Sequence, residues 1–464
     1  MRKEHDLLGE LEIPADAYYG IQTFRSTENF KITGLKLCDF PDFIKGLAYT
    51  KEAAAEANHE LGYLSDEVYK AMVQACREVA EGKFDKEFVV DMIQGGAGTS
   101  TNMNANEVIA NRANEILGKP KGSYNPCHPN NHVNFAQSTN DAYPTAAKLG
   151  ICLNTKPLIE ELKRLILSFR KKAEDLGDNI KMGRTQLQDA VPMTLGQEFE
   201  SYAASLEDEI EQIEFAEKNL YTINMGATAI GTGINSDPMY IPKVTDYLSK
   251  ISALPLKAAK NMIAATNDTS GFVTYSSELK RLSAKLSKIC SDLRLLSSGP
   301  RTGLYDISLP PMQPGSSIMP GKVNPVIPEV VNQICYRVIG NDTAVILAAE
   351  SAQLELNVFE PVMIYSIFES IKLLINGMKT LRERCIDGIV GNYEHCKNSV
   401  LRSIGLVTAL NPVIGYEASS DIAKTALREN KGVYDLVLER GLLSKEKLDE
   451  VLKPENMTKP RKLK

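Results

Sequence analysis

The sequence predicts a mainly α-helical protein with a long central helical bundle, flanked by smaller N- and C-terminal domains. Apolar residues recur at alternating steps of three and four along several long segments, and glycine or proline stands near the ends of these segments. The regions before and after them mix short helical patterns with polar loops. A length of 464 residues also fits about three structural units. We therefore expect domains at residues 1–140, 141–396 and 397–464, with the bundle in the middle one.

The clearest helical stripe ends at Gly299 and Pro300, which interrupt a helix. It consists of Leu279, Leu282, Leu286, Ile289, Leu293 and Leu296. Similar stripes lie in residues 158–176 and 195–220, and two further segments, 328–356 and 361–384, carry a proline near the first turn, where its missing N–H is tolerated. Five helices of this length expose more apolar surface than one bundle hides, so we expect several chains to associate into a multi-subunit helical core.

The composition is that of an ordinary globular chain and excludes several classes of protein. Hydrophobic residues make up 43% and charged residues 24%, which excludes a disordered chain. The net charge of -6 lacks the basic excess of a protein that binds nucleic acid. The start, MRKEHDLLGE, lacks the apolar core of a signal peptide, and no run of about eighteen apolar residues predicts a membrane span. Eight scattered cysteines without close pairs predict free thiols and a cytoplasmic location.

Four polar stretches interrupt the helical patterns and are the candidate functional loops: residues 94–107, 130–145, 182–194 and 314–325. The last is not a Walker A phosphate loop, because five residues separate its glycines and Val323 follows the lysine. The GTGINS segment has Ser236 where a dinucleotide fingerprint has its third glycine. His128 and His132 lie four residues apart, but the neighbouring prolines favour a loop with ordinary hydrogen bonds over a metal site. We expect no metal and no cofactor.

The four stretches share a high content of hydrogen-bond donors. These are Thr99, Ser100, Thr101, Ser138, Thr139, Asn140, Thr185, Ser316, Ser317, Lys322 and Asn324. Hydroxyls, amides, backbone N–H groups freed by glycine and one lysine can together surround the oxygens of a carboxylate. Taken singly, each serine, threonine or asparagine also suits a helix cap or a turn. The residues alone therefore predict a site for a small anion.

The same stretches resemble the signature segments of a known enzyme superfamily. GSSIMPGKVNP, QSTNDAYPT, QGGAGTSTNMNANE and MGRTQLQDAVPMTLGQE are similar to those of the fumarase/aspartase superfamily, and the similarity extends over nearly the whole chain. GGAGTS and QSTNDAYPT resemble the aspartate ammonia-lyases of that superfamily, whereas class II fumarases more typically read TGSGTQSNMN and QSSNDTFPT. One departure concerns Gln186, since fumarases usually carry a histidine there that pairs with a glutamate at the position of Glu329. The resemblance therefore implies no His–Glu relay, and we expect Glu329 to be a residue of a first helical turn.

The resemblance implies reversible elimination of ammonia from L-aspartate to give fumarate through an aci-carboxylate carbanion. Ser316 would abstract the C3 proton as the base, with its alkoxide stabilised by Lys322 and nearby backbone N–H groups. The implied substrate-binding residues are Thr99, Ser138, Thr139, Asn140, Thr185, Gln186, Ser317 and Asn324. The superfamily also implies a homotetramer in which each active site is built from three chains, with a small dicarboxylate as its partner and neither nucleic acid nor membrane.

Two alternative functions stay open. A class II fumarate hydratase would form the same carbanion from malate and differ only in its leaving group. A non-catalytic helical scaffold would use the serines and threonines only as caps, although it has no need for Ser316, Lys322 and Asn324 in one loop shaped by glycine and proline.

Overall fold

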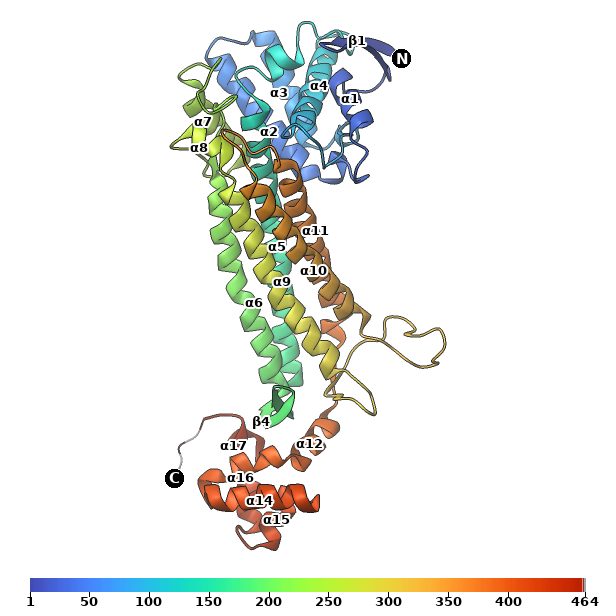
Figure 1. The fold of residues 1–464 in the computed structure, drawn as a ribbon, viewed down its shortest axis with the longest axis vertical. Helices are drawn as coiled ribbons and strands as arrows, with labels where there is room; N and C mark the ends of the chain where they lie inside the picture. The colour runs from blue at the N-terminus through green and yellow to red at the C-terminus, as the bar shows by residue number, and fades with distance from the viewer. Residues whose placement is uncertain (461, 463–464) are drawn as a thin grey trace. The chain divides into compact units, whose positions relative to one another are not determined.

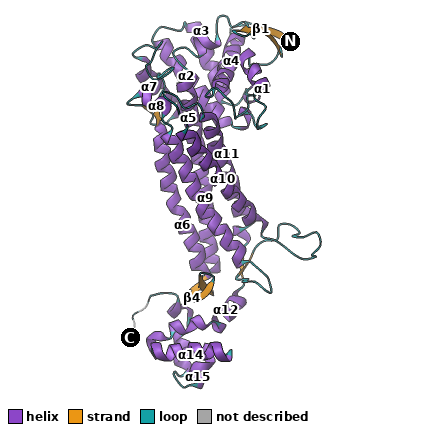
Figure 2. Cartoon of the chain, viewed as in Figure 1, coloured by secondary structure: helices purple, strands orange, loops and turns teal. Residues whose placement is uncertain are grey.

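The computed structural model describes residues 1–460 and 462 and confirms the mainly α-helical fold. Helices dominate, and the strands form short two-stranded sheets (Figure 2). The chain divides into two compact units, each made of three segments. The first unit comprises residues 1–159, 211–283 and 336–374, and the second comprises residues 160–210, 284–335 and 375–464.

Five helices of more than twenty residues, labelled in Figure 1, each contribute to both units of the described chain. They are α5 (Thr139–Leu176), α6 (Leu195–Lys218), α9 (Ser270–Leu296), α10 (Val326–Glu350) and α11 (Glu360–Arg384). The predicted stripes coincide with these helices except at Leu220, which lies in a 3-10 turn after the end of α6, and all six apolar residues of the stripe in α9 are buried. The prediction of a helix to residue 356 was wrong, because α10 ends at Glu350. Leu354 takes a left-handed backbone there with φ of 53°, and Gln353 and Leu356 bond to each other's backbone instead of continuing the helix.

Side-chain contacts join the long helices within each unit. In the first unit, the hydroxyls of Thr155 on α5 and Tyr275 on α9 lie 2.8 Å apart, both buried. In the second unit, the ring of Phe169 on α5 lies with its centroid 5.8 Å from that of Tyr202 on α6. Polar pairs inside apolar contacts fix the register of helices, because a mismatched register would leave them unpaired.

The remaining helices of the first unit pack beside one another, and α2 contacts α3, α4 and α7. They are α1 (Ile21–Asn29), α2 (Pro41–Glu60), α3 (Asp66–Ala80), α4 (Thr99–Ile116), α7 (Tyr240–Ser252) and α8 (Met262–Asn267), with 3-10 turns at Leu37–Asp39, Asp85–Glu87 and Asn219–Tyr221. The strands of this unit are β1 (Arg2–Asp6), β2 (Gly9–Ile13), β5 (Thr222–Ile223) and β6 (Lys257–Ala258). One buried apolar cluster joins α2, α5 and α7 through residues such as Ala54, Leu149 and Val244.

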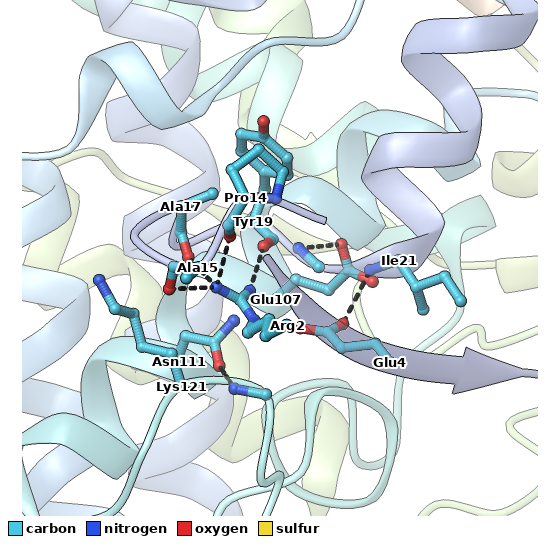
Figure 3. A network of polar contacts seen from close by, with 12 residues as sticks. Arg2, Glu4, Pro14, Ala15, Ala17, Tyr19, Ile21, Glu107, Asn111 and Lys121 are labelled. Carbon is cyan, nitrogen blue, oxygen red and sulfur yellow. Dashed lines mark hydrogen bonds and ion pairs between the residues drawn. The ribbon is translucent and has the colours of Figure 1, made fainter. Parts of the chain in front are cut away.

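A network of charged side chains, of which Glu4 and Glu107 are buried, fixes the N-terminal hairpin and the start of α1 (Figure 3). The guanidinium of Arg2 donates to the backbone carbonyls of Pro14, Ala15, Ala17 and Tyr19 at 2.6–3.1 Å. Carboxylates from two other elements accept the first N–H groups of α1. Glu4 on β1 accepts the N–H of Ile21 at 2.9 Å. Glu107 on α4 accepts the N–H groups of Gly20 and Gln22 at 2.8 and 2.9 Å. Helix α1 therefore begins without a side-chain cap of its own, because the two carboxylates satisfy its free donors.

The second unit adds a hairpin and a group of short helices. Its strands are β3 (Ile180–Thr185), β4 (Gln188–Thr194), β7 (Ile307–Ser308) and β8 (Val390–Gly391). Its short helices are α12 (Tyr393–Arg402), α13 (Asn411–Ile414), α14 (Tyr416–Glu429), α15 (Val433–Glu439), α16 (Lys445–Val451) and α17 (Pro454–Met457). Two 3-10 turns lie at Ile386–Gly388 and Ile404–Ala409. A second buried cluster joins Met182 of β3 to apolar residues of these helices, including Leu406, Ile422 and Leu436. The C-terminal helices thus pack against the β3–β4 hairpin.

No helix among the described residues combines the length and the apolar character that a membrane crossing needs.

Candidate active site

The first candidate stretch, residues 94–107, is a loop only as far as Gly98, because α4 begins at Thr99. Gly98 has a left-handed backbone with φ of 92°, and a Cβ at this position would lie 2.5 Å from the ring of Tyr143 on α5. Only glycine satisfies both constraints. Thr99 is the first residue of α4, is exposed, and donates its hydroxyl to the carbonyl of Gly96 at 2.7 Å. The loop thus presents Thr99 at the positive end of a helix, beside the first turn of α5.

The QSTND segment caps the start of α5 through the side chains of Ser138 and Asp141. Ser138 donates its N–H to Asp141 Oδ1 at 2.9 Å, and its own Oγ accepts the N–H of Asn140 at 3.2 Å. Asp141 Oδ2 also accepts the N–H groups of Gly226 and Thr228, both at 3.0 Å. Burial raises the pKa of Asp141 to about 6, while these hydrogen bonds act in the opposite direction. One buried carboxylate therefore joins the Ser138–Asn140 turn to residues 226–228.

A cleft of about 690 Å³ lies at this junction in the first unit. Its lining includes Asn134, Gln137 and Ser138 together with residues 228–229 and 234–235. Thr139 is buried behind the surface, and its Oγ1 accepts from Asn102 Nδ2 on α4 at 3.3 Å. Asn140 donates to the carbonyl of Ala229 at 2.7 Å. The first unit thus holds Ser138, Thr139 and Asn140 in one turn at the cleft, and Thr99 lies at the start of α4, the helix whose Asn102 bonds to Thr139.

The third candidate stretch, expected as a loop, forms the β3–β4 hairpin of the second unit. Its turn residues Gln186 and Leu187 both have left-handed backbones, with φ of 54° and 64°. Such a turn favours Asn and Gly, so each non-glycine residue here stores strain on the order of 1 kcal/mol. Arg184 donates to the buried Asp306 at 2.6 Å next to the turn. Thr185 and Gln186 are thereby held exposed at the tip.

The fourth stretch is a loop closed at its base by two hydrogen bonds. Gly315 donates its N–H to the carbonyl of Lys322 at 2.7 Å, and Asn324 donates its side-chain amide to the carbonyl of Gly315 at 2.8 Å. Ser316 Oγ accepts the N–H groups of Ile318 and Met319 at 3.2 and 3.1 Å. The same two donors that make Ser316 a turn residue would stabilise negative charge on its oxygen. Ser317 and Lys322 are exposed on this loop of the second unit.

Other candidates of the sequence have local structural partners. His132 Nδ1 accepts the N–H of His128 at 2.9 Å, and His128 Nδ1 accepts that of Asn130 at 3.1 Å, within a π-helical turn at Pro129–Val133. Both histidines thus make ordinary hydrogen bonds, as favoured from the sequence. Glu329 lies in the first turn of α10, as expected. Within the described part of the chain, no group of three or more His, Cys, Asp or Glu side chains is arranged to hold a metal ion.

Sequence reasoning missed the buried polar residues that support these donors. Lys51 on α2 is fully buried, and Asn102 and Asp141 are also removed from solvent. Lys51 lies in helical register with Leu47, Ala54 and Asn58 on a mostly apolar face, a pattern that places it on the inner face of the helix but does not indicate a function. Asp141 follows Ser138 at the spacing of a capping box, but its bonds to residues 226–228 join segments far apart in the sequence.

Comparisons with known proteins agree with this architecture. A family model described as "Lyase" matches residues 9–340, and one described as "Fumarase C C-terminus" matches residues 406–459. The chain is 57% identical to an aspartate ammonia-lyase of Pseudomonas aeruginosa, covering 99% of this chain and 97% of that protein. It is 55% identical to an aspartate ammonia-lyase of Helicobacter pylori, covering 99% and 98%.

Solved structures give the same result. A fumarate lyase:delta crystallin from Brucella melitensis bound to cobalt has a TM-score of 0.96 at 51% identity, covering 99% of this chain and all of that one. A class II fumarase from Schistosoma mansoni has a TM-score of 0.92 at 35% identity, covering 98% of each chain. The chain therefore belongs to the fumarase/aspartase superfamily of lyases.

We expect Gly98→Ala to destabilise the protein by about 2–4 kcal/mol, because the new Cβ is both strained at φ of 92° and in collision with Tyr143. Gly96→Ala is the matched control: its φ is 86°, but its nearest contact is an ordinary 3.8 Å, so it should cost only about 1 kcal/mol. Urea unfolding measures both changes. Equal losses in the two variants would contradict the close packing of α4 against Tyr143.

Proposed function

We propose that the protein is an aspartate ammonia-lyase, which converts L-aspartate reversibly to fumarate and ammonia. The observation that carries this proposal is the identity of 49–57% over 99% of the chain to aspartate ammonia-lyases of several bacteria. The donor-rich turn at Ser138–Asn140 supports it as well, since such a turn suits the carboxylates of a small dicarboxylate substrate.

We propose that Ser316 is the catalytic base and that Lys322 assists it. The alkoxide of Ser316 takes the proton from C3, and the electron pair of that bond spreads into the adjacent carboxylate. The aci-carboxylate then returns this electron pair to form the C2–C3 double bond of fumarate, and the protonated amino group leaves C2 as ammonia with the electron pair of the C–N bond. The N–H groups of Ile318 and Met319, 3.2 and 3.1 Å from Ser316 Oγ, support this role because they favour the charged oxygen.

The doubly charged aci-carboxylate requires fixed donors more than any other help. We assign this task to the proposed substrate-binding residues, which come from all four candidate segments. They are Thr99, Ser138, Thr139, Asn140, Thr185, Gln186, Ser317 and Asn324. Gln186 can donate or accept a hydrogen bond but carries no charge, so the base is assigned to Ser316 without a relay through this position. The mechanism needs no cofactor.

The first test compares two substrates. The purified protein should release fumarate from L-aspartate, followed by its ultraviolet absorbance, and should release little or none from L-malate. A class II fumarate hydratase would do the reverse, so turnover of malate without turnover of aspartate would contradict the proposal. Tight binding of succinate with turnover of neither substrate would instead favour the non-catalytic scaffold.

We also propose that the chain forms a homotetramer in which the active sites are shared between chains. Thr139 is the first residue of α5, and Thr185 comes after the end of this helix. Tyr336, Gly340, Thr343 and Leu347 recur on one face of α10 and are all exposed, which supports packing of this helix against another chain.

Sharing of sites predicts that two inactive variants rescue each other. Chains with Thr185→Val and chains with Ser316→Ala should each lose nearly all activity, because each lacks one essential group of every site. Co-expression should restore activity, and random pairing leaves roughly one site in four with both residues intact. No recovery in demonstrably mixed tetramers would show that Thr185 and Ser316 of the same chain serve the same site.

A cytoplasmic location is proposed on the basis of the eight free cysteines, seven of which are buried. We also propose a division of the chain into domains at residues 1–140, 141–396 and 397–464. The last of these includes residues 461, 463 and 464, which lie outside the described part.

A further inference from the structure

Lys51 is a fully buried lysine in the middle of α2. Its ammonium donates to three side-chain amides: Asn102 Oδ1 at 2.7 Å, Asn134 Oδ1 at 3.1 Å and Gln137 Oε1 at 2.8 Å. An ammonium has three N–H donors, so every one of them has an acceptor. Side chains of α4 and of the 134–137 segment thus form a binding site for the ammonium that α2 carries.

The charge of Lys51 is not neutralised by these contacts, because all three acceptors are uncharged amides. Asp141 on α5 favours the charged form, but its oxygens accept backbone N–H groups from Ser138, Gly226 and Thr228. Burial lowers the pKa of Lys51 to about 7, with Asp141 and the thiol of Cys76 on α3 acting in the opposite direction. A buried cation without a contacting anion is costly to keep, and such groups are concentrated at functional sites.

The three acceptors connect Lys51 to the candidate active site. Asn134 and Gln137 line the same cleft as Ser138. Asn102 donates through its Nδ2 to Thr139 Oγ1 at 3.3 Å and to Asn134 Oδ1 at 3.1 Å. One amide layer therefore separates the ammonium of Lys51 from the cleft and from the proposed substrate-binding residues.

We propose that Lys51 is a positioning residue that holds the two donor segments of the first unit together and supplies positive potential to a dicarboxylate in the cleft. This inference rests on the proposed function, since it takes the ligand to be a dianion. The charge acts through Asn102, Asn134 and Gln137 and does not touch the substrate. The overall charge of the chain is -6, so a local cation behind the donors offsets repulsion of the ligand.

The test uses two ligands that differ in charge: succinate, a dianion, and butyrate, a monoanion of the same chain length. Their dissociation constants are measured by calorimetry in the full-length protein and in Lys51→Met, which keeps the apolar stem and removes the charge. Coulomb energy is proportional to the charge of the ligand, so a roughly tenfold weaker binding of succinate should accompany only a roughly threefold weaker binding of butyrate. The KM for L-aspartate should rise by a larger factor than kcat falls.

Lys172→Met is the matched control. Lys172 is a buried lysine of α5 in the second unit that donates to the carbonyls of Asp387 and Ile389 at 3.2 and 3.1 Å. Its removal should lower the unfolding temperature without changing either dissociation constant. Unchanged succinate binding in Lys51→Met, or equal losses for succinate and butyrate, would overturn the inference, because a merely structural role does not distinguish the two charges.

Asn102→Asp extends the test if Lys51→Met does not fold. The new carboxylate would lie beside the ammonium and neutralise it while the buried lysine stays in place. The same unequal losses for succinate and butyrate are expected, and equal losses would again overturn the inference. Binding is measured without turnover, so the inference and the proposed function can fail separately. A wild-type protein that binds succinate but does not convert aspartate would contradict the proposed function. The comparison of succinate with butyrate would still decide the inference about Lys51.

Discussion

The arrangement of the site in the first unit depends on one buried carboxylate, that of Asp141. It accepts N–H groups from Ser138 at the start of α5 and from Gly226 and Thr228 in a distant loop. The backbone of a helix leaves unpaired N–H donors at its first turn, and such donors favour the binding of an anion there. Asp141 satisfies the donors that face inward and leaves the hydroxyls and amides of Ser138 and Asn140 in position beside the cleft.

The long helices could be predicted from sequence because their stability comes from a periodic apolar face, which is a local pattern. The stripe of α9 shows this, since each of its six apolar residues is buried. The β3–β4 hairpin was missed because its turn, Gln186–Leu187, lacks the Asn-Gly signal and is kept in a left-handed backbone by its surroundings. The end of α10 was placed six residues too late for a similar reason, since the left-handed Leu354 carries no sequence signal.

The candidate site could be predicted only in part. Its loops stand out as polar interruptions of helical patterns, but the roles of Ser316 and Lys322 came from resemblance to a superfamily and stay predictions. Lys51 could not be recognised as functional, because a single lysine in an apolar stripe usually extends its ammonium to solvent. Its partners Asn102, Asn134 and Gln137 lie 51–86 residues away, and no local pattern connects them.

The central claim is that Asp141 fixes the donors that bind the substrate, and Asp141→Asn tests it most directly. The variant replaces one acceptor oxygen by a donor and leaves buried N–H groups unpaired. Because this cost displaces the donors beside the cleft, the dissociation constant of succinate should rise at least roughly tenfold. Amide hydrogen exchange at residues 224–229 should accelerate while the long helices stay protected. Asp268→Asn is the control, because Asp268 accepts the N–H of Ser270 at the exposed start of α9 at 2.9 Å. Unchanged succinate affinity in Asp141→Asn, despite faster exchange at 224–229, would contradict the account.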